Sequence, residues 1–240
     1  MAEPADSLRK SLAPLAWVRP PQQQRSQQTF ERILDAAEGF IVENGVQALT
    51  VSAVVARASS SVGAFYARFP DKGALLSTLH QRDCEAALAT TDAALDPERW
   101  SGIELPQAIE QITRFCVRLF SERQKLLLGF LGLASEDVQF ARRRAWVSDQ
   151  VANRLHQFLL TRAEDVAHFD LKLAARMTVR LIFGSLEAEV GLRSATGSIE
   201  PIEDDRLALE LSRAILGYLG VPVSSRLPRS ASPLPQGVQP

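Results

Sequence analysis

The chain has 240 residues, 46% of them hydrophobic and 23% charged, with a formal net charge of −1. This composition is that of a folded globular protein and excludes a disordered chain, and the charge excludes nucleic-acid binding through bulk basicity. The apolar runs are too short for a membrane-spanning helix. Acidic as well as basic residues (Glu3, Asp6, Arg9 and Lys10) precede any apolar block, which does not resemble a signal peptide. We therefore expect a cytoplasmic protein.

The two ends of the chain differ from its middle. Residues 1–24 are rich in proline and glutamine and predict a disordered arm, and residues 221–240, rich in proline and serine, predict a disordered tail. Between them apolar residues recur at every third or fourth position, without strand-like alternation of useful length. The pattern predicts an all-α fold of about nine helices.

Four helices are predicted in close succession at the start of the folded region. The first ends at Gly45, and the second follows Thr50, whose hydroxyl suits an N-cap. The third begins at Ser61, again a cap residue, and ends just before Pro70, because proline disfavours the helical conformation in the preceding residue. Asp71 then caps the fourth, which continues to about residue 94.

Longer helices fill the rest of the chain after a break at Asp96 and Pro97. They are predicted from near residue 106 to 119, over roughly 122–134, over 137–165, over 170–191, and over 203–219 with Gly220 as the stop. The two cysteines, Cys84 and Cys116, lie within helical patterns and are predicted to be free thiols. Neither cysteine spacing nor histidine spacing suggests a metal site, and no cofactor motif is present.

The short helix, tight turn and short helix over residues 50–69 are typical of a helix-turn-helix. The second helix of such a unit enters the major groove of DNA with its N-terminal residues toward the base edges. Small residues there let the backbone approach the bases and leave methyl groups for contact with thymine. These residues are Ser61, Val62, Gly63 and Ala64. Phe65 and Phe69 are expected to face the core, and Tyr66 to point outward toward a phosphate.

Candidate phosphate ligands bracket this unit. Thr50 and Lys72 each lie at a helix N-terminus, where free N–H groups favour an anion, and Arg25, Arg57 and Arg68 add charge nearby. Taken singly, each is more simply an ordinary solvated residue, and only as a set do they favour a DNA interface. Most acidic residues of this region lie on the first helix and are expected to point away from the groove.

The segment "ERILDAAEGFIVENGVQALTVSAVVARASSSVGAFYARFPDKGALL" resembles the DNA-binding domain of the TetR family of bacterial transcriptional regulators. The matching positions are Ile33, Leu34, Ala36, Ala37, Gly45, Thr50, Ala58, Ser61, Gly63, Tyr66, Phe69 and Lys72. The resemblance implies a three-helix DNA-binding domain over residues 25–80 and a larger helical effector-binding and dimerisation domain over residues 81–220. Two positions depart from the family pattern: Ser59 replaces a turn glycine, and Arg68 stands where histidine is common.

The resemblance also implies a homodimer and a small-molecule effector. The last two helices carry the expected dimer interface, formed by Met177, Leu181, Gly184, Ser185, Leu211, Ile215 and Tyr218. The middle helices carry the expected pocket for a small hydrophobic effector, lined by Phe115, Leu119, Phe130, Leu133, Trp146 and Phe183. For each of these side chains a plain core position is the alternative. The run from Arg142 to Arg144 is interpreted as a solvated face, with an anion site as the alternative.

The sequence thus indicates a DNA-binding transcriptional regulator, expected to be a repressor that a small-molecule effector releases from a roughly palindromic operator. An enzyme is disfavoured, because the chain lacks the nucleophile, phosphate-binding and metal motifs of the common enzyme classes. The alternative is a helical protein-interaction module that keeps a helix-turn-helix without strong DNA binding, which the near-neutral charge of residues 19–80 leaves open.

Overall fold

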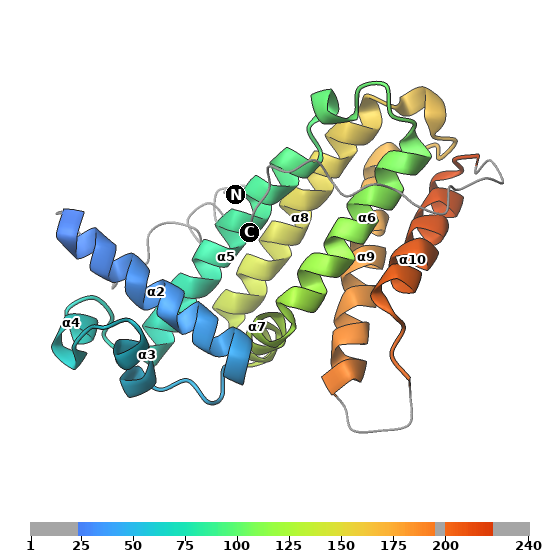
Figure 1. Cartoon of the computed structure of the whole chain (residues 1–240). Coiled ribbons are helices and arrows are strands. Elements are labelled where there is room, and N and C mark those ends of the chain that lie inside the picture. Colours follow the sequence, from blue (N-terminus) through green and yellow to red (C-terminus); the bar gives the residue numbers. More distant parts are fainter. Residues whose placement is uncertain (1–23, 195–199, 223–240) are drawn as a thin grey trace. The chain divides into compact units, whose positions relative to one another are not determined.

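The computed structural model describes residues 24–194 and 200–222, without the side chains of residues 24, 25 and 194 (Figure 1). Within these residues nine α-helices and two short 3₁₀-helices form, and no strand, which confirms the predicted all-α class. The α-helices are α2 (Gln24–Asn44), α3 (Val51–Arg57), α4 (Val62–Tyr66), α5 (Lys72–Ala94), α6 (Leu105–Glu122), α7 (Gln124–Glu136), α8 (Val138–Leu160), α9 (Leu171–Ser194) and α10 (Asp204–Leu219). The 3₁₀-helices are η2 (Pro97–Trp100) and η3 (Ala163–Asp165).

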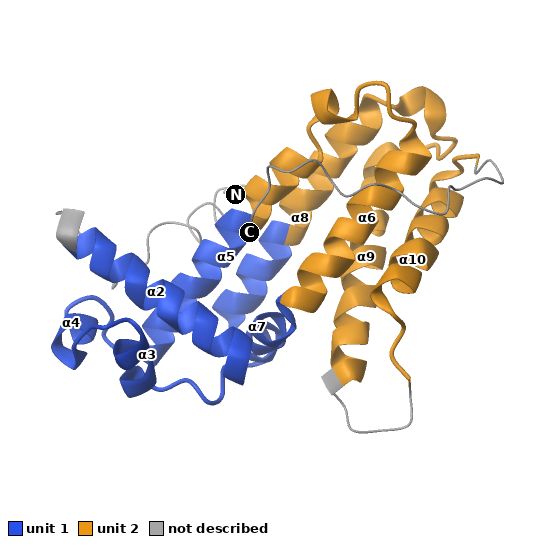
Figure 2. Ribbon diagram, in the orientation of Figure 1, with its two compact units in different colours: residues 1–86, 123–147 blue, residues 87–122, 148–240 orange. Residues whose placement is uncertain are grey.

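The described chain divides into two compact units (Figure 2). Unit 1 comprises the chain up to residue 86 together with residues 123–147, and unit 2 comprises residues 87–122 and those from 148 onward. Both α5 and α8 contribute to both units, so the division does not follow helix ends. The predicted domain boundary at residue 80 stays a prediction. The predicted arm and tail lie outside the described residues, apart from positions 24, 221 and 222.

Helix ends in the structure follow the local chemistry of the sequence. The side chains of Thr50, Ser61 and Asp71 each accept a hydrogen bond from the backbone N–H three residues further on, at 3.2, 3.1 and 2.7 Å. Gly45 and Gly220 follow α2 and α10 with φ angles of 83° and 68°, the left-handed conformation that only glycine adopts without strain. The three predicted caps and the two predicted stops are confirmed.

Two helices end earlier than the sequence predicts. Helix α4 stops at Tyr66, and the following residues form a tight turn in which the Phe69 N–H still donates to the Phe65 carbonyl at 2.9 Å. Helix α8 stops at Leu160 instead of near residue 165. Its last turn tightens, because the next two N–H groups each bond to the carbonyl three residues back, and η3 follows as a separate element. In the part of the chain that the structure describes, no helix has the length and apolarity that crossing a bilayer requires.

The core of unit 1 includes aromatic side chains from α4, from the turn that follows it and from α2. Phe65 and Phe69 have no exposed surface, and the ring of Phe30 from α2 stacks on that of Phe69 with centroids 5.2 Å apart. Burial of each large aromatic side chain contributes roughly 2 kcal/mol. Helix α7 approaches the same region closely, because a Cβ placed on Gly129 would lie only 2.9 Å from the Cβ of Val46.

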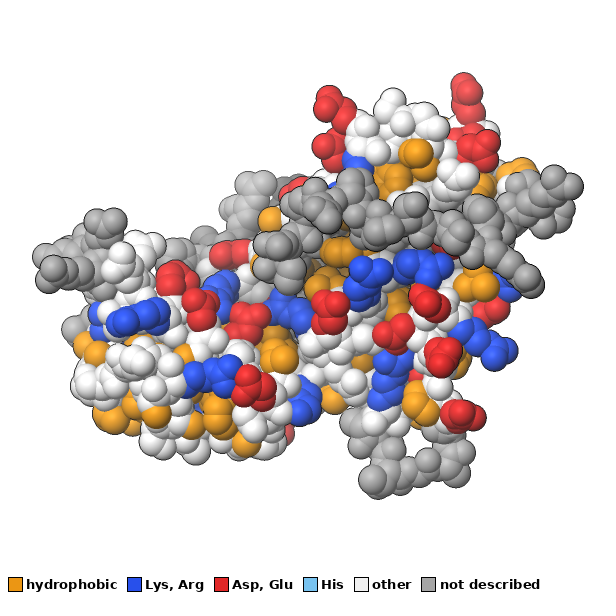
Figure 3. Space-filling model, viewed as in Figure 1, with side chains coloured by type: hydrophobic (Ala, Val, Ile, Leu, Met, Phe, Trp, Pro, Cys, Tyr) orange, Lys and Arg blue, Asp and Glu red, His pale blue; other side chains and the backbone are white. Residues whose placement is uncertain are grey.

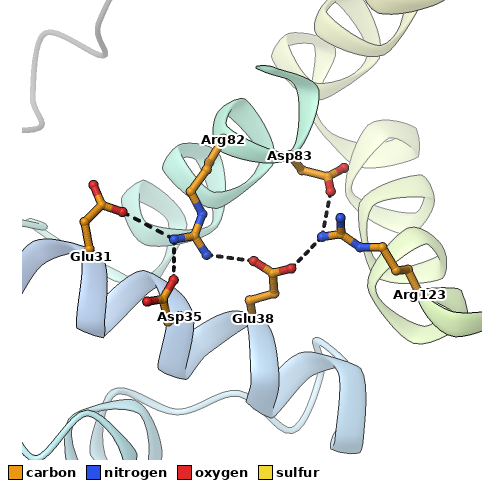
Figure 4. A network of polar contacts seen from close by, with 6 residues as sticks. All are labelled: Glu31, Asp35, Glu38, Arg82, Asp83 and Arg123. Atoms are coloured by element: carbon orange, nitrogen blue, oxygen red, sulfur yellow. Dashed lines mark hydrogen bonds and ion pairs between the residues drawn. The ribbon is translucent and has the colours of Figure 1, made fainter. Parts of the chain in front are cut away.

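A network of ion pairs attaches α2 to its neighbours in unit 1 (Figure 4). Its members are Glu31, Asp35 and Glu38 of α2, Arg82 and Asp83 of α5, and Arg123, which directly precedes α7. Arg82 contacts Asp35 at 2.6 Å and Glu38 at 2.7 Å, and Arg123 contacts Glu38 at 2.5 Å. Burial raises the pKa of Asp83, which contacts Arg123 at 2.9 Å. The network fixes the side of α2 that carries its acidic residues against α5 and the start of α7.

Unit 2 has its own apolar core, to which α6, α9 and α10 contribute, with Ala108, Ala174 and Ile215 fully buried. Charged side chains join these helices at the surface: Arg114 contacts Asp205 at 2.5 Å, and Arg193 contacts Asp204 at 2.7 Å. Both cysteines are free thiols, as predicted. Burial raises the pKa of Cys84 to about 12 and that of Cys116 to about 11, so both remain protonated and unreactive at neutral pH.

Two titratable side chains lie within the core of unit 1, His80 of α5 and Arg143 of α8, which are 5% and 1% exposed. Arg143 Nη1 lies 2.9 Å from His80 Nδ1, and the guanidinium donates to the carbonyl and to the hydroxyl of Ser77 at 3.2 Å each. The His80 ring packs against Phe130 and Phe140, with centroids 4.7 and 4.8 Å away. Burial, and then the charge of Arg143, lowers the pKa of His80 to about 3.

The interpretation of the run from Arg142 to Arg144 as a solvated face is therefore wrong for its middle member. Arg142 and Arg144 are exposed, whereas Arg143 is nearly completely buried. The reason is helical geometry, since successive residues of a helix point in directions about 100° apart and only one of three neighbours can face the core of unit 1.

Substitution of Ser59 by glycine should stabilise the protein. Ser59 has a φ of 46°, and a left-handed non-glycine residue carries a strain of about 1 kcal/mol that glycine relieves. We expect Ser59→Gly to raise the melting temperature by a few degrees in a thermal unfolding experiment, with DNA binding retained. The matched control is Ser60→Gly, whose φ is not positive and which should bring no gain. An unchanged or lower melting temperature for Ser59→Gly would contradict the strain.

The buried His80 should make stability depend on pH. Its pKa of about 3 in the fold lies below the ordinary value of 6.5, so below pH 6.5 the unfolded chain takes up a proton that the folded chain does not. The free energy of unfolding should therefore decrease as the pH is lowered from 6.5 to 3, by at most about 1.4 kcal/mol per pH unit. Urea unfolding of wild type and His80→Gln across this range measures the effect, and parallel pH curves for the two proteins would refute it.

Candidate nucleic-acid interface

Helices α3 and α4 and the turn between them form the predicted helix-turn-helix within unit 1. The turn is closed by backbone hydrogen bonds: the Ser59 N–H donates to Ala56 O at 3.2 Å, and the Ser60 N–H donates to Val55 O at 2.9 Å. Ser59 itself takes the left-handed conformation usual for glycine in this place. The serine thus preserves the turn geometry at the cost of strain.

Helix α4 has two faces of opposite character. Phe65 is fully buried, while Val62 and Tyr66 are 50% and 54% exposed. Ser61 and Gly63 are also exposed, and a Cβ on Gly63 would meet only the Ser61 hydroxyl, 3.9 Å away. Ala64 is half-buried. The small residues predicted to approach bases therefore lie at an open helix start, with the aromatic residues oriented as predicted: Phe65 and Phe69 inward and Tyr66 outward.

The predicted phosphate ligands Thr50 and Lys72 lie close together although they are 22 positions apart in sequence. The Lys72 ammonium donates to the carbonyl of Leu49 at 3.2 Å, immediately before the N-cap of α3. Thr50 caps that helix, and both side chains are exposed. An ammonium group next to the free N–H groups of a helix start adds to the positive potential there.

Arg68 has a role that the sequence does not reveal. Its guanidinium donates to the Ala64 carbonyl at 2.7 Å and to the hydroxyl of Ser26 in α2 at 3.1 Å. The side chain is half-buried and joins the first helix of the unit to the helix meant for the major groove. Contact of Arg68 with a phosphate stays a prediction, and the side chain of Arg25 lies outside the described residues.

The charge around α3 and α4 is low. Arg57 forms a two-pronged ion pair with Glu43 at 2.6 and 2.7 Å, and the hydrogen bond from Arg57 lowers the pKa of that carboxyl. Figure 3 shows mostly uncharged and hydrophobic side chains where α4 lies. Among the described side chains few basic groups lie here, so DNA bound at α4 would be held by a small number of positioned donors.

The six residues predicted to line an effector pocket belong to both compact units. Phe130, Leu133 and Trp146 lie in unit 1, and Phe115, Leu119 and Phe183 lie in unit 2. Phe130 is part of the buried cluster around His80, and Phe183 packs on Phe120 with centroids 5.8 Å apart. A common pocket for the six residues stays a prediction.

The seven residues predicted for a dimer interface divide into two groups. Met177, Leu181 and Ser185 of α9 and Tyr218 of α10 are half-buried, and Gly184 is exposed with open space where a Cβ would stand. Leu211 and Ile215 are instead 7% and 0% exposed and belong to the core of unit 2. Ile215 thus packs within its own subunit, and the dimer interface as a whole stays a prediction.

Loss of the hydrogen bonds of Arg68 should destabilise unit 1, whose helices α2 to α4 we call the DNA-reading head. Arg68→Ala removes hydrogen bonds from a charged group to α2 and α4, and we expect a loss of about 1 to 2 kcal/mol in chemical unfolding. Arg32→Ala is the matched control, because it removes the same charge from an exposed side chain whose hydrogen bond among the described residues is a long one, to Thr29 at 3.4 Å. Equal stability of the two variants would show that the bridge contributes nothing.

Solved structures of TetR-family regulators share this fold. One from Mesorhizobium loti has 18% identity and a TM-score of 0.64, covering 81% of this chain and 98% of its own. One from Haloarcula marismortui has 16% identity and a TM-score of 0.63, covering 80% and 96%. RolR, solved in complex with resorcinol, has 24% identity and a TM-score of 0.51, covering 82% and 90%. No curated protein matches the sequence.

Sequence models of protein families cover most of the helical region. Residues 33–79 match the model of the bacterial regulatory proteins of the tetR family, which includes the whole helix-turn-helix. Residues 104–219 match the model of the tetracyclin repressor-like C-terminal domain, from the start of α6 to the end of α10. With both of its parts matched in their expected order, this chain belongs to the TetR family of transcriptional regulators, which are DNA-binding proteins and not enzymes.

Proposed function

We propose that the protein is a repressor that binds a roughly palindromic operator as a homodimer and leaves it when a small hydrophobic effector binds. The observation that carries the DNA-binding part is the division of α4 into a buried face, with Phe65, and an open face, with Val62 and Tyr66 about half exposed. A helix held from one side by aromatic side chains presents its other side rigidly to the major groove. As a protein that binds chromosomal DNA, it would work in the cytoplasm.

The contacts divide into two classes under this proposal. Tyr66, Thr50 and Lys72 bind phosphates and fix the position of the protein on the duplex. Val62 and Ala64 touch base edges, with Ser61 and Gly63 leaving room for the approach of the backbone. The low charge of the head makes each half-site weak, because few phosphates are neutralised. Two linked heads then bind far better than one.

Helix α9 supports the homodimer in this proposal. Leu173, Met177 and Leu181 recur every four residues and so lie on one face of α9, where Leu173 is 43% exposed and the other two are half-buried. The exposed Gly184 continues this face and would let a partner helix approach closely. A continuous apolar stripe with a small residue at its end is a suitable surface for a second copy of the chain.

The small effector is proposed from the family and from one neighbour. RolR shares this fold and was solved with resorcinol, so the fold accommodates a small aromatic molecule. Release from DNA would then require that the effector favours a geometry of the two heads that no longer matches half-sites about 34–36 Å apart.

Removal of the proposed phosphate ligands should weaken binding to every DNA sequence. We expect Tyr66→Phe and Lys72→Ala each to raise the Kd by about three- to tenfold, with Lys72→Ala also lowering the salt dependence of the Kd. Lys172→Ala on α9 is the control, because it removes the same charge from an exposed lysine outside the interface. Fluorescence anisotropy with the DNA that flanks the protein's own gene measures these values.

The second candidate is a protein-interaction module without strong DNA binding. The specific observation in its favour is the ion pair between Arg57 and Glu43, which neutralises Arg57, the basic residue at the end of α3. This second candidate predicts that the wild-type protein does not bind the flanking DNA even at low salt, where electrostatic attraction is strongest. Binding at low salt that Tyr66→Phe and Lys72→Ala weaken would exclude this candidate.

A further inference from the structure

Arg143 differs from the other arginines that hold unit 1 together. Arg82 and Arg123 each contact carboxylates in the ion-pair network of α2, α5 and Arg123. Arg143 is more deeply buried than either, yet among the described residues no acidic side chain contacts its guanidinium. Its Nε–H is buried and finds no acceptor in the part of the chain that the structure describes. A full positive charge thus lies within the aromatic core without a matching negative charge in contact.

The groups that contact Arg143 are all neutral, and Asp137 attracts its charge without contacting it. They are the carbonyl and the hydroxyl of Ser77, Nδ1 of the uncharged His80, and the ring of Phe140, whose centroid lies 5.5 Å from the guanidinium carbon. Hydrogen bonds and ring contacts reduce the cost of burying a cation but do not remove it. A hydrophobic side chain of similar volume would serve the core better. Stability alone therefore does not account for an arginine here.

We propose that Arg143 is the recognition group for an organic anion, a small aromatic or aliphatic carboxylate, and that this anion is the effector. The inference rests on the proposed function and adds the chemical class of the effector. A planar guanidinium with a free Nε–H matches a carboxylate, which accepts two parallel hydrogen bonds from it. The rings of His80, Phe130 and Phe140 make the surroundings apolar, which suits the hydrophobic body of such a molecule.

The position of Arg143 also connects anion binding to the DNA-reading head. A carboxylate bound to the free Nε–H takes its second, parallel hydrogen bond from Nη2, which now donates to the hydroxyl of Ser77 in the second turn of α5. Helix α5 begins at Lys72, whose side chain bonds to the backbone just before α3. The anion and α5 therefore compete for one guanidinium. An effector that takes it loosens the tie between α8 and the helix that follows α4.

The test uses the full chain and three pairs of probes of equal size: benzoate and benzamide, phenylacetate and phenylacetamide, hexanoate and hexanamide. Thermal shift and isothermal titration calorimetry should show that at least one carboxylate binds and that its neutral amide binds at least tenfold more weakly. Arg143→Met should lose this binding. Arg142→Met removes the same charge from the exposed neighbour and should keep it. If no carboxylate binds, or if each binds no better than its amide, the proposal is overturned.

The stability of the variants separates recognition from a structural tie. If the charge is unpaired, Arg143→Met should melt at or above the wild-type temperature. If Arg143→Met does not fold, Arg143→Lys retains the charge without the fork and should bind the carboxylate at least tenfold more weakly than wild type. Wild-type affinity in either variant would overturn the proposal.

DNA binding, measured separately by anisotropy without any carboxylate, distinguishes failure of this inference from failure of the proposed function. If wild type binds the carboxylate through Arg143 but does not bind DNA, the proposed repressor function is wrong. If wild type binds DNA but no carboxylate through Arg143, only the proposed anion site is wrong. Intact DNA binding that the bound carboxylate reverses in wild type and not in Arg143→Met would support both.

Discussion

The burial of two aromatic side chains determines the geometry of the candidate interface. Helix α4 has only five residues, too few for a helix to be stable without tertiary contacts. Phe65 and Phe69, both fully buried, supply those contacts and fix the rotation of the helix. Once they occupy the inner side, Val62 and Tyr66 must face outward. The open face offered to DNA is thus a direct consequence of packing within unit 1.

Hydrogen bonds and ion pairs of arginines hold together the helices that the aromatic residues orient. Arg68 joins α4 to the start of α2, and Arg82 with Arg123 joins the acidic side of α2 to α5 and to α7. These are partly buried pairs with short contacts, so they restrict orientation more than isolated surface ion pairs do. They also pair Glu31, Asp35 and Glu38 of α2 with arginines, which offsets the negative charge on that side of the helix. The head gains both rigidity and a less negative surface from the same contacts.

Local chemistry explains why so much of the fold could be predicted from the sequence. Caps such as Thr50 and Ser61, and stops such as Gly45, act through backbone groups a few residues away, and all three behave as expected. Long-range pairing leaves no such local signal. Neither the attachment of Arg68 to Ser26 nor the burial of Arg143 between two exposed arginines can be read from spacing alone. Periodicity identifies an apolar face but not what that face packs against. The sequence therefore could not show that Ile215 belongs to the core of its own subunit.

Helix α5 receives attachments from three sides within twelve residues. Lys72 reaches back to the backbone before α3, His80 touches Arg143 of α8, and Arg82 holds α2. Because a helix turns as a stiff rod, a rotation of α5 about its axis cannot alter one attachment and leave the others untouched. A substitution that rotates α5 is consequently expected to disturb the position of α2 and of the start of α3 together, although neither helix adjoins α5 in the sequence.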